Sequence, residues 1–363
     1  MRILLITPLY PPAVGGAATY FADIVPWFQA EPLIEKLVLV TEKMVGEPGQ
    51  IVDGKLTILR QLPRRVSEKR PYLIHALTYL QTQLWFQQKL AKLIEMHQID
   101  LVHFHTRFRG KLVYASLTKL PIPVLADLRD KMSNPADLAQ CSQHLLCCAL
   151  GVARFATEGG YPVSRLTHIP ITFESPSALP LPTVAAIQAH FGLDERPYLL
   201  YLGDITPNKG VYELLDAFAQ WQTIEPHMTL VLAGMNREGT SFTNRVNQMN
   251  NVRFLGQLSH PHALALMQAA AMVLLPSRSE ALGSVILEAI GLGKKVLCPP
   301  NIPEFERHLP DFVLPEVSSE AIFHMIQKIW HSPITPSYPL ETHAVQGVVN
   351  QIVSLYQQLV EKG

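Results

Sequence analysis

Short apolar runs that alternate with helical stretches constrain the fold of this chain most strongly. Each run has four to six residues and does not alternate strictly with polar residues, which is typical of strands buried on both faces of a sheet. The runs are Arg2–Thr7, Leu37–Thr41, Leu101–Thr106 and Val124–Leu128 in the first half, and Tyr198–Gly203, Leu230–Gly234, Val252–Gly256, Met272–Ser277 and Lys295–Cys298 in the second. Helical periodicity between them, as in Tyr72–His97 and Tyr212–Gln222, predicts an α/β fold with parallel sheets and right-handed crossovers.

The two series of strands predict two domains. The chain has 363 residues, more than one ordinary core holds, and three prolines fall within Ser175–Thr183 between the series. We therefore expect a first Rossmann-like domain over 1–175, a linker over 176–190, a second Rossmann-like domain over 191–343 and a C-terminal helix over 344–363. A ligand is expected in the cleft between two such domains, beyond the carboxyl ends of the strands.

Composition excludes several classes of protein. Hydrophobic residues make up 48% of the chain and charged residues 17%, which excludes a disordered chain. Four cysteines are too few for a disulfide framework, and no Cys/His spacing resembles a zinc site. The start MRILLITPLYPP predicts a strand and not a signal peptide, and the longest apolar stretch, 263–275, is too short to span a bilayer. We expect a cytoplasmic protein.

The formal net charge of zero conceals an asymmetry. Residues 1–180 carry 19 Lys and Arg against 14 Asp and Glu, and residues 181–363 carry 11 against 16. The basic excess lies in Lys55–Arg70 and Arg107–Lys131. These stretches are either solvated loops and helix faces or a surface that meets something anionic.

Two loops that follow strands are suited to phosphate. Gly15 and Gly16 precede a helix expected at Thr19–Phe28, and paired glycines let backbone N–H groups approach a diphosphate. Lys209 lies in the loop after the first strand of the second domain, near the start of the next helix. A tight turn and a solvated lysine are the alternatives. The dinucleotide pattern Gly-x-Gly-x-x-Gly is absent, which disfavours a dehydrogenase.

Two acids stand out in the second domain. Glu280 lies in a loop after a strand, and Glu288 lies on the helix expected to begin near Gly283 or Ser284. A buried carboxylate needs hydrogen-bond donors such as ribose hydroxyls, although an exposed helix position is the alternative for Glu288.

In these segments the chain resembles the retaining group 1 glycosyltransferases, family 4 of the GT-B fold enzymes. The matching motifs are Glu-x7-Glu on Glu280 and Glu288, Gly-Gly on Gly15 and Gly16, and His-x-His on His103 and His105. The resemblance covers essentially the whole chain. It implies two doubly wound Rossmann-like parallel-sheet domains facing across a cleft, with the last helix returning to the first domain.

The resemblance also implies roles for matching residues. Lys209, Glu280 and His105 would be catalytic. Donor contacts would come from Gly15, Gly16, Gly203, Lys209, Gly256, Glu280, Leu282, Gly283, Ser284 and Glu288, with Glu288 on the ribose and Gly256 near the base. The acceptor side would hold His105, Arg107, Arg129 and Asp130. A satisfied core position is the alternative for either histidine.

Two positions depart from the family pattern. Asp204 stands where the family usually has an arginine that binds the diphosphate, and Arg278 or Arg237 is a candidate substitute from another loop. The Gly-Ile-Pro-Glu loop of the family is Asn301-Ile302-Pro303-Glu304 here.

The expected activity is transfer of a sugar from a UDP- or GDP-linked donor to a saccharide, lipid-linked saccharide or small-molecule acceptor in bacterial glycan, exopolysaccharide or glycolipid synthesis. No Asp-x-Asp motif lies in a suitable loop, so we expect metal-independent catalysis without a cofactor and no nucleic-acid partner. The stretch Lys55–Arg70 and the following Tyr72–Phe86 suggest peripheral contact with the inner face of a membrane or a phosphate-bearing acceptor. The alternatives are a catalytically impaired protein that binds a nucleotide sugar or a partner, and a nucleotide-sugar epimerase.

Overall fold

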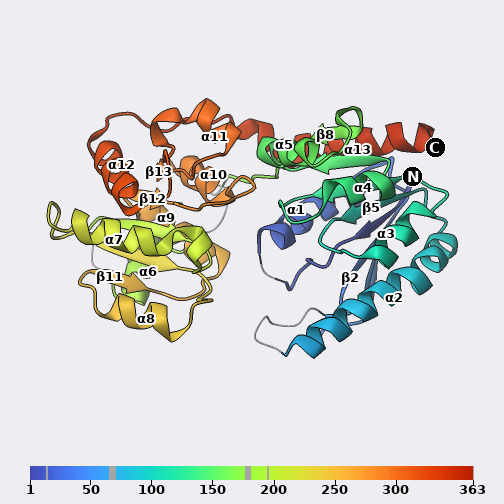
Figure 1. The fold of residues 1–363 in the computed structure, drawn as a ribbon, viewed down its shortest axis with the longest axis horizontal. Helices are drawn as coiled ribbons and strands as arrows, with labels where there is room; N and C mark the ends of the chain where they lie inside the picture. Colours follow the sequence, from blue (N-terminus) through green and yellow to red (C-terminus); the bar gives the residue numbers. More distant parts are fainter. Residues whose placement is uncertain (14, 65–70, 176–180, 194–195, 363) are drawn as a thin grey trace. The chain divides into compact units, whose positions relative to one another are not determined.

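The chain divides into two compact units. The computed structural model describes residues 1–13, 15–64, 71–175, 181–193 and 196–362. Unit 1 is Met1–Thr172 together with Thr342–Gly363, and unit 2 is Phe173–Glu341 (Figure 1). The C-terminal segment therefore belongs to the same unit as the N-terminal half.

Within the described residues, unit 1 is built on an eight-stranded sheet in the order β3-β4-β2-β1-β5-β6-β7-β8. The strands are β1 (Arg2–Ile6), β2 (Lys36–Glu42), β3 (Gln50–Asp53), β4 (Leu56–Leu62), β5 (Leu101–His105), β6 (Val124–Leu128), β7 (His144–Cys147) and β8 (Leu166–His168). Neighbouring strands are parallel except β3 and β4. The residues of β5 and β6 are all buried, as expected of central strands covered on both faces.

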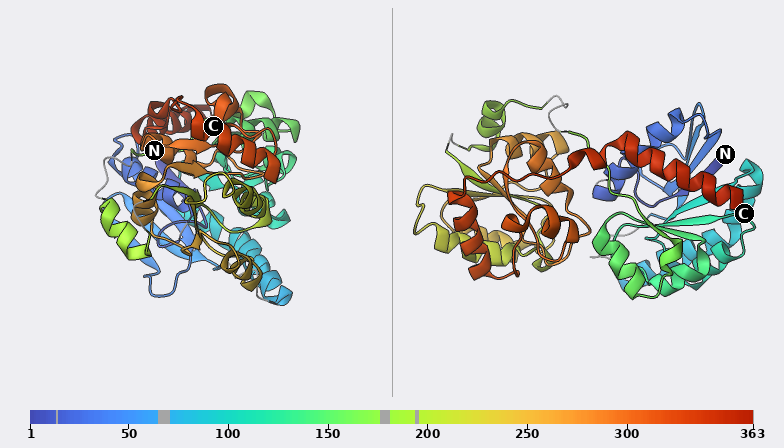
Figure 2. Two further views of the ribbon diagram at one scale, coloured as in Figure 1. Left: turned by 90° about the vertical axis from the view of Figure 1, so that its left-hand side faces the viewer. Right: turned by 90° about the horizontal axis from the view of Figure 1, so that it is seen from above.

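The helices of unit 1 cover this sheet. They are α1 (Gly16–Ala30), α2 (Tyr72–His97), α3 (Lys111–Thr118), α4 (Pro135–Cys141), α5 (Leu150–Glu158) and α13 (Val345–Lys362). The C-terminal α13, red in Figure 2, lies along the blue and green elements of unit 1. Its buried face packs on α1, where the rings of Phe28 and Tyr356 lie 5.6 Å apart.

In the described part of unit 2, five parallel strands run in the order β11-β10-β9-β12-β13. They are β9 (Tyr198–Leu202), β10 (Thr229–Ala233), β11 (Val252–Phe254), β12 (Met272–Leu274) and β13 (Lys295–Leu297). The helices are α6 (Val184–Phe191), α7 (Val211–Trp221), α8 (Thr240–Asn247), α9 (His260–Ala269), α10 (Ser284–Gly291), α11 (Pro303–His308) and α12 (Ser319–His331). The nine strand positions expected from the sequence, four in unit 1 and five in unit 2, are confirmed.

Part of the expected linker is helical. Residues 184–190 belong to α6, because the Thr183 side chain accepts a hydrogen bond from Ala186 N and Ile187 is buried. Residues 176–180 of the expected linker lie outside the described residues.

The basic stretch Lys55–Arg70 is only in part a surface. It contains β4, and Arg60 on that strand is 5% exposed. Lys55 Nζ donates to Glu31 O at 3.0 Å. The interpretation of the whole stretch as a basic surface is therefore wrong for Arg60, while 65–70 lie outside the described residues.

Candidate functional site

The first candidate segment follows β1 in unit 1. Gly15 has φ 130° and is the N-cap residue of α1, where no side chain caps the helix. A Cβ on Gly15 or Gly16 would meet no atom within 4 Å, so the space beside both glycines is open. The structure thus places two accessible backbone groups at a helix N-terminus, the arrangement that suits an anion.

Arg60 supports this loop from β4, and the sequence marked it only as part of the basic stretch Lys55–Arg70. Its Nη2 donates to Pro11 O at 2.7 Å and lies 3.4 Å from Glu47 Oε2. The sequence around Arg60 does not predict which loop its side chain will contact.

The two histidines of β5 are buried on the same face of the sheet. His105 is 1% exposed and its Nδ1 lies 3.1 Å from Thr7 Oγ1. Burial lowers the pKa of His105 to about 3, against the opposite effect of Asp127, so the imidazole is neutral at physiological pH. His103 Nδ1 lies 2.5 Å from Tyr356 Oη, which ties α13 to the sheet.

Asp127, within β6, and Arg129, directly after this strand, continue the buried network. Arg129 Nη1 lies 3.3 Å from both Asp127 carboxylate oxygens, and the guanidinium stacks 3.3 Å above the ring of Tyr20. Burial raises the pKa of Asp127, but Arg129 and His103 outweigh it and bring the pKa to about 2. The Arg129 side chain is only 7% exposed, so it supports the site from beneath and offers little surface to an acceptor.

Arg107 and Asp130 lie in the loops after the same strands but remain accessible. Arg107 Nη1 donates to Asp130 Oδ2 at 2.8 Å, and the side chains are 33% and 25% exposed. The four residues expected on the acceptor side thus separate into a buried pair, His105 and Arg129, and an accessible pair, Arg107 and Asp130.

Lys209 and Glu280 meet in unit 2. Lys209 ends a 3₁₀ turn after β9 (Pro207–Lys209), and Glu280 lies between β12 and α10. Lys209 Nζ donates to Glu280 Oε1 at 2.5 Å, and the side chains are 25% and 15% exposed. The loop order in the sequence placed both residues at one edge of the sheet, and the structure brings them into contact.

Arg278 fixes the loop that carries Lys209. Its Nη1 donates to Pro207 O at 3.0 Å and its Nη2 to Glu213 Oε1 at 2.7 Å. Gly210, with φ 66°, lets α7 begin directly after Lys209, since a Cβ there would lie 2.1 Å from Pro276 O. The contacts of Arg278 and the close packing at Gly210 fix the backbone of this loop. They therefore limit the positions that the ammonium group of Lys209 can take.

The start of α10 has the geometry expected for amide donors. Gly283 has φ 84° and is its N-cap residue, with no side chain capping the helix, and Ser284 is the first helical residue. Leu282 is buried at 1% exposure and anchors the turn. Backbone N–H groups at this end are available beside Glu280.

Glu288 and Gly256 lie further along the same edge. Glu288 is 19% exposed, which argues against a fully exposed helix position, and its Oε1 lies 3.3 Å from His260 Nε2. Gly203 N donates to Ala233 O, and Gly256 O accepts from Gly234 N at 2.8 Å, so both glycines are part of the extended strand ladder.

The described residues contain neither a cluster of metal ligands nor a helix able to span a membrane. Among them, no three His, Cys, Asp or Glu side chains are grouped as a metal site requires. None of the described helices is both long and apolar enough to cross a membrane.

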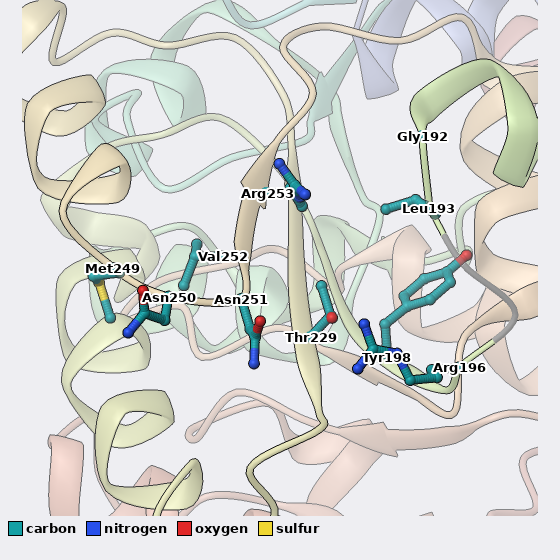
Figure 3. A pocket seen from close by; sticks show the side chains of 10 residues that line it. All are labelled: Gly192, Leu193, Arg196, Tyr198, Thr229, Met249, Asn250, Asn251, Val252 and Arg253. Carbon is teal, nitrogen blue, oxygen red and sulfur yellow. The ribbon is translucent and has the colours of Figure 1, made fainter.

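A cavity of about 220 Å³ in unit 2 lies away from these residues. Its lining includes the first residues of three strands, Tyr198, Thr229 and Val252, together with Arg196 and Arg253 (Figure 3). In a parallel sheet these amino ends are opposite to the edge that carries Lys209 and Glu280. The cavity is therefore distinct from the candidate site.

Comparisons with known proteins agree with this geometry. Residues 185–340 match the family model "Glycosyl transferases group 1". Over 327 residues, 82% of this chain and 79% of the relative, the chain is 24% identical to a GDP-mannose-dependent monoacylated alpha-(1-6)-phosphatidylinositol monomannoside mannosyltransferase of Corynebacterium glutamicum. It is 36% identical over 101 residues to glycogen synthase of Mycobacterium tuberculosis, a match that spans 26% of this chain and only 24% of that protein.

The fold is shared with solved structures. Sucrose-phosphate synthase from Thermosynechococcus elongatus superposes with a TM-score of 0.77 at 18% identity, over 100% of both chains. The chain has the GT-B fold, and the match of residues 185–340 to the group 1 model agrees with a glycosyltransferase enzyme. The comparisons do not favour the epimerase or the binding-only protein.

Proposed function

We propose that this GT-B protein is a retaining, family 4 glycosyltransferase that moves a sugar from a nucleoside diphosphate sugar to an acceptor hydroxyl without a metal ion. The observation that carries the proposal is the 2.5 Å contact between Lys209 Nζ and Glu280 Oε1 at the carboxyl edge of the sheet of unit 2. It brings a cation suited to phosphate and a carboxylate suited to sugar hydroxyls to one point.

Binding of the donor would replace the contact between Lys209 and Glu280 by one contact from each residue to the donor. Its diphosphate accepts hydrogen bonds from Lys209 and from amides at the start of α10, while its sugar hydroxyls donate to Glu280. Glu288, held beside His260, accepts from the ribose hydroxyls. The amides of Gly15 and Gly16 at the start of α1 are further candidate donors to an anion.

Catalysis would rest on stabilising the departing diphosphate. In glycosyl transfer the anomeric carbon becomes oxocarbenium-like while negative charge grows on the leaving group. Lys209 and the helix N-termini supply fixed positive potential there. Glu280 orients the sugar and forms no covalent intermediate, so the acceptor hydroxyl attacks from the face the diphosphate leaves and the configuration is retained.

His105 would act as a neutral polar group and not as a proton donor. Its pKa of about 3 leaves no proton to give at physiological pH. A hydrogen bond to a sugar hydroxyl is compatible with this neutral state, and it requires that ligand binding uncovers the ring, which is 1% exposed. Arg107 and Asp130, which are accessible, would contact the acceptor.

The donor is proposed to be UDP- or GDP-linked, and the acceptor a saccharide, a lipid-linked saccharide or a small molecule of glycan or glycolipid synthesis. The Corynebacterium glutamicum relative is named as GDP-mannose-dependent and as acting on a phosphatidylinositol mannoside. This supports a lipid-linked acceptor.

A surface of α2 supports peripheral membrane contact. Leu73, Leu77, Leu80 and Leu84, spaced by four, three and four residues, share one face of the helix and are 69%, 50%, 50% and 36% exposed. We call these four residues the α2 leucine stripe. The same helix buries Trp85 and Phe86, which therefore belong to the core. An exposed apolar stripe on a helix suits the boundary of a bilayer.

Reaction with UDP- and GDP-linked α-sugars in the presence of EDTA tests the mechanism. We expect undiminished release of nucleoside diphosphate and an α-configured product by proton nuclear magnetic resonance. A β-configured product would overturn retention, and loss of activity with EDTA that added Mg²⁺ restores would overturn metal independence.

A further inference from the structure

Asp204 and Arg237 form an ion pair on two loops that leave neighbouring strands of unit 2. Asp204 lies two residues after β9 and Arg237 four residues after β10. Arg237 Nε and Nη2 each lie 3.0 Å from Asp204 Oδ2. Both side chains are 43% exposed, so the pair is accessible from solvent.

The main chain holds the two loops together beneath this pair. Ile205 N donates to Met235 O at 2.9 Å, and Arg237 N donates to Ile205 O at 3.3 Å. The loops approach so closely that a Cβ on Gly234 would lie 1.8 Å from Gly203 O. The backbone contacts between the two loops therefore place Arg237 next to Asp204.

A turn fixes the direction in which Arg237 leaves its loop. The Asn236 side chain accepts hydrogen bonds from Glu238 N at 3.0 Å and Gly239 N at 2.9 Å, and donates to Gly239 O at 2.9 Å. Tyr201 Oη donates to Asp204 O at 2.8 Å and fixes the other loop. Both partners of the ion pair thus have an ordered backbone.

Arg278, the other arginine near this edge, is already engaged. Its guanidinium donates to Glu213 and to Pro207 O, as described above. Arg237 contacts a single carboxylate oxygen, and within the described residues its Nη1 has no hydrogen-bond partner. Arg278 thus uses both terminal nitrogens in contacts with the protein, whereas Arg237 keeps its terminal Nη1 for a ligand.

We propose that Arg237 is a second cation that binds the donor diphosphate, and that Asp204 positions it. This inference rests on the proposed function. A planar guanidinium matches phosphate oxygens in a bidentate manner, and an exposed ion pair is easily rearranged when a stronger anion binds. Asp204 then does not oppose the diphosphate, because its charge is balanced by the arginine that it holds.

Binding of UDP and GDP, with uridine and guanosine as references, tests the proposal by calorimetry. Arg237→Ala and Arg237→Gln should each weaken nucleoside diphosphate binding about 10- to 100-fold, the loss expected for hydrogen bonds to a charged group. Nucleoside affinity should be unchanged, as should the melting temperature. Arg253→Ala, at the opposite edge of the same sheet, is the matched control and should bind as the wild type does.

An exchange of the two charges separates binding from structure. The double variant Asp204→Arg with Arg237→Asp keeps an arginine on the paired loops, so it should recover most of the affinity that Arg237→Ala loses. If the wild type binds UDP or GDP and Arg237→Ala and Arg237→Gln bind it equally well, the role of Arg237 is refuted while the proposed function stands. If the wild type binds neither nucleoside diphosphate, the proposed donor class fails and the inference with it.

Discussion

Lys209 Nζ and Glu280 Oε1 lie 2.5 Å apart although 71 residues separate them in the sequence. Each is the partner of the other, so a ligand that engages both must present an anionic group to the lysine and hydroxyl groups to the carboxylate. A phosphorylated sugar has both groups on adjacent atoms. The contact therefore restricts the chemical class of the ligand more than either residue does alone.

The neutral state of His105 has a measurable consequence. Its pKa of about 3 in the folded protein lies below the value near 6.5 of an unfolded chain, so below pH 6.5 the unfolded state binds a proton that the folded state does not. The free energy of unfolding should therefore fall as the pH drops from 6.5 towards 3. Nitrogen-15 resonance of the imidazole should show a neutral ring at pH 5. His105→Gln should have a shallower slope of stability against pH, and an unchanged slope would contradict the assignment.

Asp127 predicts a second, more acidic loss of stability. Its pKa of about 2 in the fold is below the usual 3.8, so its contribution is complete above pH 3.8 and is lost as the pH falls through about 2. Asp127→Asn leaves the buried Arg129 without its counter-charge and should cost about 3–5 kcal/mol at neutral pH. Asp130→Asn, which breaks only the accessible pair with Arg107, should cost less than about 1 kcal/mol. If urea denaturation gave equal losses in the free energy of unfolding for the two variants, the buried pair would contribute no more to stability than the accessible pair.

Much of the fold could be predicted from the sequence, for an identifiable reason. Runs such as Tyr198–Leu202 have no charged residue and are buried throughout, a pattern typical of a strand covered on both faces. The strand β4, LTILRQL, was missed because its polar residues suggested a surface. Arg60 is nevertheless buried, since Pro11 and Glu47, distant along the chain, satisfy it. The strands β3, β7 and β8 were missed as well, and each has only three or four residues.

A substitution at Gly234 tests whether the loops after β9 and β10 approach each other closely. A Cβ at this position would lie 1.8 Å from a backbone oxygen, which cannot move without opening the ladder. Gly234→Ala should lower the free energy of unfolding by about 3 kcal/mol or more. Gly239→Ala is the matched control, because its φ is also positive but no atom lies within 4 Å of the added Cβ. It should cost only about 1–2 kcal/mol. A milder effect at Gly234 than at Gly239 would contradict the close approach of the two loops.

The α2 leucine stripe predicts binding to anionic vesicles. Replacing Leu73, Leu77 and Leu80 by serine should lower the partition coefficient at least about tenfold, since each partly exposed leucine contributes on the order of 1 kcal/mol when it enters the bilayer boundary. Donor hydrolysis in solution should not change. Met96→Ser, at the other end of α2 and 72% exposed, is the control and should sediment with vesicles like the wild type. Vesicle binding that survives the triple substitution would exclude this surface.

The sequence predicted which loops form the candidate site, but not which side chains contact each other there. Strand order placed the loops of Lys209, Glu280 and Glu288 at one edge, because carboxyl ends of parallel strands lie together. The partners His260 of Glu288 and Arg237 of Asp204 depend on side-chain directions that no local pattern encodes. Asn301 is an intermediate case. It takes the place of the family's glycine at φ 62°, a conformation that asparagine tolerates better than most residues.

The central claim is that Lys209 and Glu280 act on the two halves of a nucleoside diphosphate sugar, and release of nucleoside diphosphate tests it most directly. With UDP- and GDP-sugars, Lys209→Ala and Glu280→Gln should each lower the rate about 10²- to 10³-fold, as removal of an electrostatic stabiliser does. Lys328→Ala, which removes an exposed lysine paired with Asp311 in the same unit, should leave the rate unchanged. Release at the wild-type rate by Lys209→Ala and Glu280→Gln would contradict the account.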